Sequence, residues 1–168
     1  MGEEVGTRSL PAGDFADVYE REVLSVLRFL RNVVDGDADA EDLCADVFVN
    51  AWRAWPRFSG GPAGARAWLF RIARNVAVDA HRRGAGARLL PLDQPGLGLR
   101  AADETSAEMM SIRAALSRLR LADRELLAMR AAGLSYEEMA AIRGGRGDAT
   151  KVAWHRAAQR LHELLEAE

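Results

Sequence analysis

Apolar side chains recur every three or four residues in the first part of the chain, which places them on one face of an α-helix. Asp14 is the expected N-cap of this helix and Gly36 marks its end. The apolar face consists of Phe15, Val18, Tyr19, Val23, Val26, Leu27, Leu30, Val33 and Val34. The pattern predicts an amphipathic helix with one side against a core.

A second helix is predicted to begin near Asp39. Glu41 and Asp42 lie in its first turn, where carboxylates interact favourably with the helix dipole. Pro56 is expected to close the helix. Its predicted buried residues are Leu43, Val47, Phe48, Ala51 and Trp52.

Glycine and proline are frequent between Phe58 and Arg66, which predicts a surface loop. A third helix is predicted from about Arg66 to Arg83. Its inward side chains are Leu69, Ile72, Ala73, Val76 and Ala80, and its exposed stripe is Trp68, Arg71, Asn75 and Arg82. An aromatic ring, an amide and guanidinium groups are therefore expected on one face.

The segment after Ala85 holds five glycines and prolines without sustained periodicity, which predicts a linker. A fourth helix follows, with apolar residues at Met109, Ile112, Leu116 and Leu119. Asp123 is the expected N-cap of a short fifth helix, and Gly133 is its expected end.

The last part of the chain has the outline of a helix-turn-helix. Ser135 and Glu138 have the spacing of a capping box and begin a helix of about two turns. A glycine-rich turn over 144–147 follows, and Asp148 is the expected cap of the final helix. Short helix, tight turn and longer helix suit DNA binding, although plain helical hairpins share this outline.

The predicted fold class is therefore all-α, with two small helical domains joined by a flexible linker. At 168 residues the chain is too short for a large barrel or a dinucleotide-binding fold. The expected division is an N-terminal tail over 1–13, a helical domain over 14–84, a linker over 85–107 and a helix-turn-helix domain over 108–168.

Charge is distributed unevenly, although the net charge is only −2. Residues 1–50 carry 12 acids against 4 bases, whereas residues 66–88 carry six arginines against Asp79 alone. Such a basic tract indicates either contact with a polyanion or a solvated arginine-rich helix face. Arginine is also the general cation of this chain, since Lys151 is its one lysine.

Several function classes are not expected. One cysteine, Cys44, and three histidines give no metal-ligand spacing, so we expect no metal site and no cofactor. No phosphate-binding glycine motif or nucleophile–base pairing is visible, so we expect neither an enzyme nor a small-molecule substrate. No apolar run reaches the roughly 20 residues of a membrane span, so we expect a cytoplasmic protein without membrane insertion.

Two segments of the first half carry a family resemblance: DAEDLCADVFVNAWRAWPRF, 39–58, and RAWLFRIARNVAVDAHRR, 66–83. They resemble region 2 of bacterial RNA polymerase sigma factors of the extracytoplasmic-function (ECF) group. The segment LRLADRELLAMRAAGLSYEEMA, 119–140, resembles region 4 of the same group. The resemblance implies a factor that binds core RNA polymerase, recognises and melts promoter DNA, and is controlled by an anti-sigma factor.

The resemblance also implies roles for residues of the first half. Those expected to bind polymerase are Asp42, Asp46, Phe48 and Trp52, although core packing is an equally good interpretation of the two aromatic residues. The loop 59–65 and the helix after it are expected to bind the promoter -10 element, with Asn75 at a base edge and arginines at phosphates. Trp68 is either a core residue or part of this surface. The expected -10 residues are Ser59, Arg66, Arg71, Arg74, Asn75, Arg82 and Arg83.

In the second half the resemblance implies that the last helix binds the -35 element. The chain departs from the family here, because Arg143 and Gly145 occupy positions that are usually apolar and pack the two helices. Val152 and Ala153 stand where small polar and basic groups are usual, so few donors remain for base edges. The expected -35 residues are Arg146, Lys151, Val152 and Arg156.

Two alternative functions stay open. A free-standing helix-turn-helix regulator would need a dimer surface but no polymerase-binding segment. A sigma-like decoy would keep polymerase binding and lack -35 recognition, which fits the unusual turn. Copurification with core polymerase and promoter-specific transcription distinguish these alternatives from a sigma factor.

Overall fold

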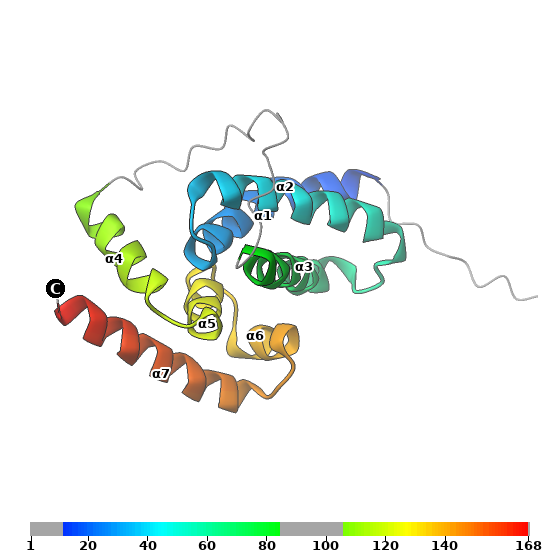
Figure 1. Cartoon of the computed structure of the whole chain (residues 1–168). Helices are drawn as coiled ribbons and strands as arrows, with labels where there is room; N and C mark the ends of the chain where they lie inside the picture. The colour runs from blue at the N-terminus through cyan, green and yellow to red at the C-terminus, as the bar shows by residue number, and fades with distance from the viewer. Residues whose placement is uncertain (1–11, 85–105, 168) are drawn as a thin grey trace, which may run out of the picture.

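The computed structural model describes residues 12–84 and 106–167, and every element within them is a helix (Figure 1). The predicted tail and linker therefore lie almost entirely outside the described residues. The first range contains α1 (Ala12–Val33), α2 (Asp37–Ala54), the 3-10 helix η1 (Trp55–Arg57) and α3 (Gly61–Gly84). The second contains α4 (Ala107–Ser117), α5 (Leu121–Ala131), α6 (Tyr136–Arg143) and α7 (Gly147–Glu166). The predicted all-α class is confirmed.

The predicted apolar face of α1 is confirmed. Seven of its nine members are buried, and Tyr19 and Val34 are half-buried against the core. α1 packs on α2 and α3 and also on α4 and α5. It is therefore the central helix of the molecule, covered by elements from both ends of the chain (Figure 1).

Three predicted helix caps are wrong by a few residues. Asp14, Asp123 and Asp148 lie inside the first turns of α1, α5 and α7. Arg120 and Arg146 hold the N-cap positions of α5 and α7 without a side-chain cap bond. A carboxylate within the first turn still interacts favourably with the helix dipole, so the sequence signal is the same for both positions.

The predicted capping box at the start of α6 and the predicted end of α5 at Gly133 are confirmed. The Ser135 side chain accepts a hydrogen bond from the Glu138 amide at 3.1 Å, and the Glu138 carboxylate accepts one from the Ser135 amide at 2.7 Å. Gly133 has a φ of +87°, and the Leu134 amide donates to the Met129 carbonyl. These bonds satisfy backbone groups at the end of α5 and the start of α6.

The two halves of the chain share one hydrophobic core. α5 packs on α1, and α6 packs on α3 (Figure 1). Buried side chains of α5 and α6, such as Met129 and Met139, belong to the same cluster as Leu27 and Phe70 of the first half. The boundaries between tail, domains and linker stay a prediction, but the two helical units pack together in this structure.

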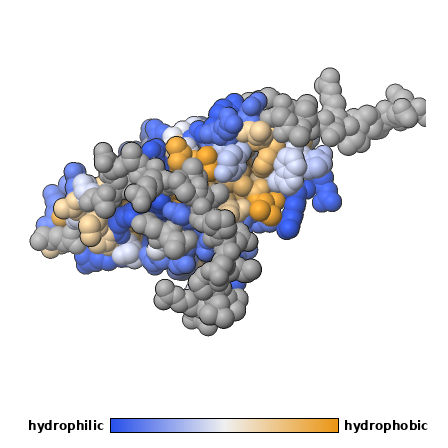
Figure 2. All heavy atoms as spheres, turned by 90° about the horizontal axis from the view of Figure 1, so that it is seen from above, coloured by the Kyte–Doolittle hydropathy of each residue, from blue (hydrophilic) through white to orange (hydrophobic). Residues whose placement is uncertain are grey.

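The expectation that α2 buries Trp52 is wrong, because this side chain is 51% exposed. Its ring contacts the edge of Phe15, with centroids 5.1 Å apart. The tryptophan that is buried in the core is Trp55 of η1. Figure 2 views the molecule from above, and hydrophobic side chains lie exposed among hydrophilic ones on this side.

Candidate nucleic-acid interface

The loop before α3 is much shorter than the sequence suggested. Only residues 58–60 lie outside regular helix between η1 and α3, so the predicted loop over 59–65 is wrong. Pro62 is the second residue of α3, where a missing amide donor costs no hydrogen bond. Ser59 stays exposed in the remaining loop.

Two glycines shape this short loop. Gly61 has a φ of +65°, which favours glycine. A Cβ at Gly60 would lie 2.7 Å from the Phe58 ring. The loop can therefore approach the aromatic ring closely and still turn into α3.

The loop residue Phe58 packs against aromatic rings of η1 and α3. Trp55 and Phe58 stack with centroids 5.3 Å apart, and Phe58 lies 4.7 Å from Trp68. Trp68 is half-buried in this cluster, which agrees with its interpretation as a core residue. The cluster joins η1, the loop residue Phe58 and α3.

One end of α3 presents an exposed polar surface. Asn75, Arg82 and Arg83 are all exposed; the two arginines lie in the last turn of α3, and Asn75 lies about two turns before them. Arg82 lies 3.9 Å from the Asp79 carboxylate, and the Arg83 Nε donates to the Asp79 carbonyl. Exposed ion pairs of this kind are weak, so both guanidinium groups can move to a phosphate.

The other three predicted -10 arginines contact the second half of the chain. Arg66 donates to the Ala132 carbonyl and pairs with Glu22 of α1 at 3.3 Å. The Arg71 Nη2 donates to the Ala141 carbonyl at 2.8 Å. No local sequence signal predicts these contacts, because their partners lie 66 and 70 residues away along the chain.

Arg74 forms an ion pair across the two halves. Its Nε donates to the Glu125 carboxylate at 3.1 Å, and the Glu125 side chain is only 2% exposed. Arg143 lies 3.9 Å from the same carboxylate. Burial lowers the pKa of Arg143, and the nearby Glu125 carboxylate opposes this shift. Arg143 therefore joins α6 to α5 within the second half, beside the Arg74–Glu125 pair, which gives it a role at a position where the family usually has an apolar residue.

The predicted -35 residues lie at the start of α7 and along its exposed side. Arg146, Lys151, Val152 and Arg156 are all exposed. A Cβ at Gly145 would meet no neighbouring atom within 4 Å, so this turn position does not pack the helices. α6 and α7 instead meet through Tyr136 and Trp154, whose ring centroids lie 6.1 Å apart.

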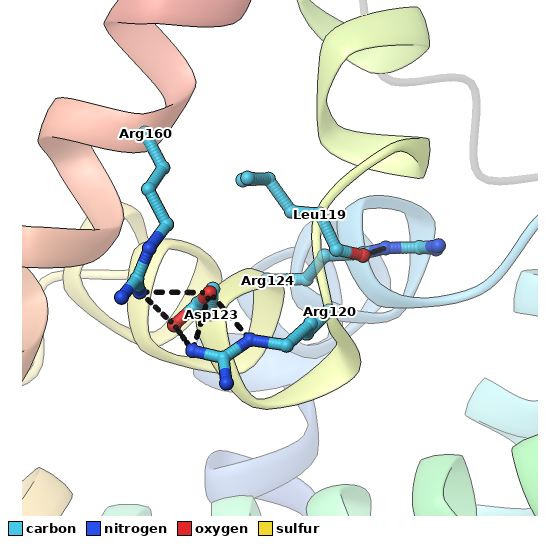
Figure 3. Close-up of polar contacts among 5 residues, drawn as sticks. All are labelled: Leu119, Arg120, Asp123, Arg124 and Arg160. Carbon is cyan, nitrogen blue, oxygen red and sulfur yellow. Dashed lines mark hydrogen bonds and ion pairs between the residues drawn. The ribbon is translucent and has the colours of Figure 1, made fainter.

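A buried carboxylate holds α7 against α5. Asp123 is 4% exposed and accepts hydrogen bonds from Arg160 at 3.1 Å and from Arg120 at 3.2 Å (Figure 3). Its neighbour Arg124 points away from this cluster and donates to the Leu119 carbonyl. Asp123 therefore positions the helix that carries the predicted -35 residues, a role that sequence reasoning missed.

The predicted polymerase-binding residues differ in exposure. Asp42 and Asp46 are exposed on α2, whereas Phe48 is 6% exposed and contacts Tyr19, with ring centroids 4.7 Å apart. Val49, which was not predicted from the sequence, is exposed on the face that carries the two acids. The surface of α2 thus combines carboxylates with apolar groups.

The described residues form neither a metal-binding cluster nor a membrane-spanning helix. In residues 12–84 and 106–167, no three His, Cys, Asp or Glu side chains gather as metal ligands would. Within the same residues, no helix is long and apolar enough to cross a membrane.

Comparison with known proteins identifies the family. Residues 18–86 match the model of sigma-70 region 2. The RNA polymerase sigma factor CarQ of Myxococcus xanthus is 32% identical over 90% of this chain and 88% of its own length. The ECF RNA polymerase sigma factor SigD of Mycobacterium tuberculosis is 33% identical over 88% of this chain and 77% of its own length.

Solved structures with similar folds are also sigma factors. CnrH, in complex with the cytosolic domain of CnrY, has a TM-score of 0.70 and 27% identity, covering 96% of this chain and 94% of that one. RpoE of Bartonella quintana, in complex with the anti-sigma factor NepR, has a TM-score of 0.71 and 26% identity, covering 94% and 99%. The chain belongs to the ECF group of RNA polymerase sigma factors, which act in transcription initiation.

Proposed function

We propose that α2 binds core RNA polymerase, that α3 and the loop before it bind the -10 element, and that α7 binds the -35 element. The observation that carries the proposal is the exposed surface of the C-terminal half of α3, where Asn75 precedes Arg82 and Arg83 by about two helical turns. An amide can pair with a base edge while guanidinium groups pair with phosphates. This combination suits recognition of a nucleic acid in a defined register.

The exposed side chains of α2 support the proposal that this helix binds core RNA polymerase. Asp42 and Asp46 offer charges to a basic partner, and Val49 and Trp52 offer apolar area beside them. Interfaces of this kind combine a buried apolar centre with charged groups that select the partner. Phe48 is assigned a supporting role below this surface, because it is buried against Tyr19.

The proposal includes an anti-sigma factor as a regulatory partner. The similar structure of RpoE contains the anti-sigma factor NepR. Sigma factors are regulatory proteins, and we infer that this chain likewise acts by binding and catalyses no covalent step. A cytoplasmic location follows from the proposed partners, since bacterial RNA polymerase and promoter DNA are found there.

Reconstituted transcription tests the proposal. Core RNA polymerase is combined with the full chain and supplied with a promoter library, and the transcripts are sequenced to identify start sites. Initiation from promoters with shared -10 and -35 sequences is expected only when the chain is present. Copurification with polymerase without such transcripts would indicate a decoy, and promoter binding without copurification would indicate a free-standing regulator.

A further inference from the structure

Two cavities lie where α1 meets α4 and α5. The first has a volume of about 290 Å³ and lies between the end of α1 and α4, with Arg124 of α5 beside it. The second has a volume of about 250 Å³ and lies between α1, α4 and α5. Arg31, Asn32 and Arg113 line both cavities, so the two spaces adjoin. The residues proposed to bind polymerase and promoter DNA lie elsewhere on the molecule.

The second cavity is cationic. Its charged lining consists of Arg28, Arg31 and Arg113, and no acid is among the described residues around it. The Arg31 Nη2 donates to the Glu41 carboxylate of α2 at 3.3 Å, which restrains this guanidinium. Guanidinium groups bind phosphate oxygens through paired, charge-assisted hydrogen bonds. The second cavity therefore suits phosphate groups.

The first cavity combines apolar and polar groups. Val34 and Leu116 line it with hydrocarbon, and Asp35 contributes a carboxylate. Arg124 forms part of the wall, because its guanidinium donates to the Asp35 carboxylate at 3.0 Å and to backbone carbonyls. A carboxylate repels phosphate but accepts hydrogen bonds from the hydroxyl groups of a ribose. The first cavity therefore suits a nucleoside.

We propose that the two cavities form one site for a nucleoside diphosphate, with the nucleoside in the first cavity and the phosphates among Arg28, Arg31 and Arg113. The two volumes together fall within the range of about 300–1,000 Å³ that is usual for sites of small ligands. Inorganic pyrophosphate would leave the first cavity unfilled. A nucleoside alone would bring no phosphate to the three arginines of the second.

Both halves of the chain contribute to this site. Arg28 and Arg31 belong to α1, whereas Arg113 belongs to α4. A ligand that contacts both helices stabilises their packing, so the melting temperature of the chain should rise with ligand concentration. Such binding needs neither polymerase nor promoter, and the inference is therefore independent of the proposed function.

Calorimetric titration of the full chain tests the site. The compounds are ADP, GDP, inorganic pyrophosphate and adenosine, each at physiological salt, and thermal melting is recorded with the same four. At least one of the two nucleotides is expected to bind about tenfold or more tightly than pyrophosphate or adenosine, because it fills both cavities. The same nucleotide should raise the melting temperature.

Two variants address the phosphate groups, and a third is the matched control. Arg113→Gln is expected to weaken nucleotide binding about tenfold, because Arg113 lines both cavities. Arg28→Gln is expected to weaken it about threefold, because Arg28 is exposed. Arg118→Gln should leave the affinity unchanged, since Arg118 is an exposed arginine at the end of α4 and lines neither cavity.

Two results would overturn the site. One is an affinity for ADP and GDP no higher than that for pyrophosphate. The other is an equal loss of affinity in Arg113→Gln and Arg118→Gln, which would show a general attraction of polyanions to arginine. Thermal melting without ligand verifies that each variant folds, and the exposed Arg28 keeps the test decisive if Arg113→Gln does not. Transcription by the reconstituted wild type is measured separately, so failure of the nucleotide site and failure of the proposed function are distinguishable.

Discussion

The Arg74 guanidinium lies 3.1 Å from the Glu125 carboxylate, and this ion pair joins α3 to α5. Because the carboxylate is buried, the pair costs more to break than an exposed one. The polar side chains of α3 therefore fall into two groups with different roles. The Arg74 side chain holds the two halves together, whereas the side chains of Asn75, Arg82 and Arg83 are exposed.

Substitution of Asp46 is expected to prevent holoenzyme formation. Asp46→Arg places a cation where a basic partner is proposed, and such like-charge contacts cost several kcal/mol, so affinity for core polymerase should fall at least about a hundredfold. The melting temperature should not change, because Asp46 is exposed. Size-exclusion chromatography with core polymerase measures the effect. Asp17→Arg, at an exposed acid of α1, is the control, and normal binding of Asp46→Arg would refute the α2 assignment.

Two substitutions on α3 are expected to act differently on promoter choice. Asn75→Ala should relax preference among -10 sequences, because an amide at a base edge carries sequence information. Arg82→Ala should weaken all promoters alike and lower the salt slope by about one, because it removes a phosphate contact. Transcription from a -10 library at several salt concentrations measures both effects. Identical profiles for the two variants would contradict the division of roles.

The -35 element is expected to contribute little sequence discrimination. The exposed residues of α7 include Val152 and three cations nearby, but few donors arranged for a base edge. Scrambling the -35 bases should therefore lower transcription by less than about tenfold, since one good bidentate contact gives roughly 1–3 kcal/mol. Scrambling the -10 bases should lower it far more. A hundredfold loss from the -35 change would mean that Val152 and its neighbours do recognise sequence.

The buried carboxylate of Asp123 is expected to stabilise the second half. Asp123→Ala removes the acceptor of Arg160 and Arg120, and the cost should be about 1–3 kcal/mol of unfolding free energy, limited because both arginines are partly exposed. Urea denaturation measures this value. Glu163→Ala, at an exposed acid far from the first turn of α7, should change it by no more than about 0.5 kcal/mol. Equal unfolding free energies for the two variants would contradict a stabilising role of Asp123.

The thiol of Cys44 is expected to be unreactive in the folded protein. Cys44 is fully buried, and burial raises the pKa of its thiol from 9.0 to about 12, so the protonated form persists at neutral pH. Because the folded pKa is the higher one, the thiol favours the folded state below pH 9 and this contribution is lost as the pH rises toward 12. A thiol-specific dye at pH 8 should label only unfolded chains. Rapid labelling under native conditions would contradict this.

The sequence alone determined the helices and the family. Apolar residues at helical spacing predicted the buried face of α1, and Ser135 with Glu138 predicted the start of α6, because both signals act within a few residues. The same local signals located the first residue of a helix less exactly. Pro62 suggested a loop to us, although a proline in the first turn is compatible with a helix.

Only the tertiary structure decided how the two halves meet. Phe29 lay outside the predicted apolar face of α1, yet it is buried against Phe70 of α3, because α1 is covered on several sides. Arg74 and Arg82 were both expected to bind the -10 element, but the packing of the second half on the first places Glu125 of α5 beside Arg74 and leaves Arg82 exposed. Residue types and spacing fix which face of a helix is apolar. They do not specify which distant charge will lie opposite a given arginine, since that depends on the packing of helices far apart along the chain.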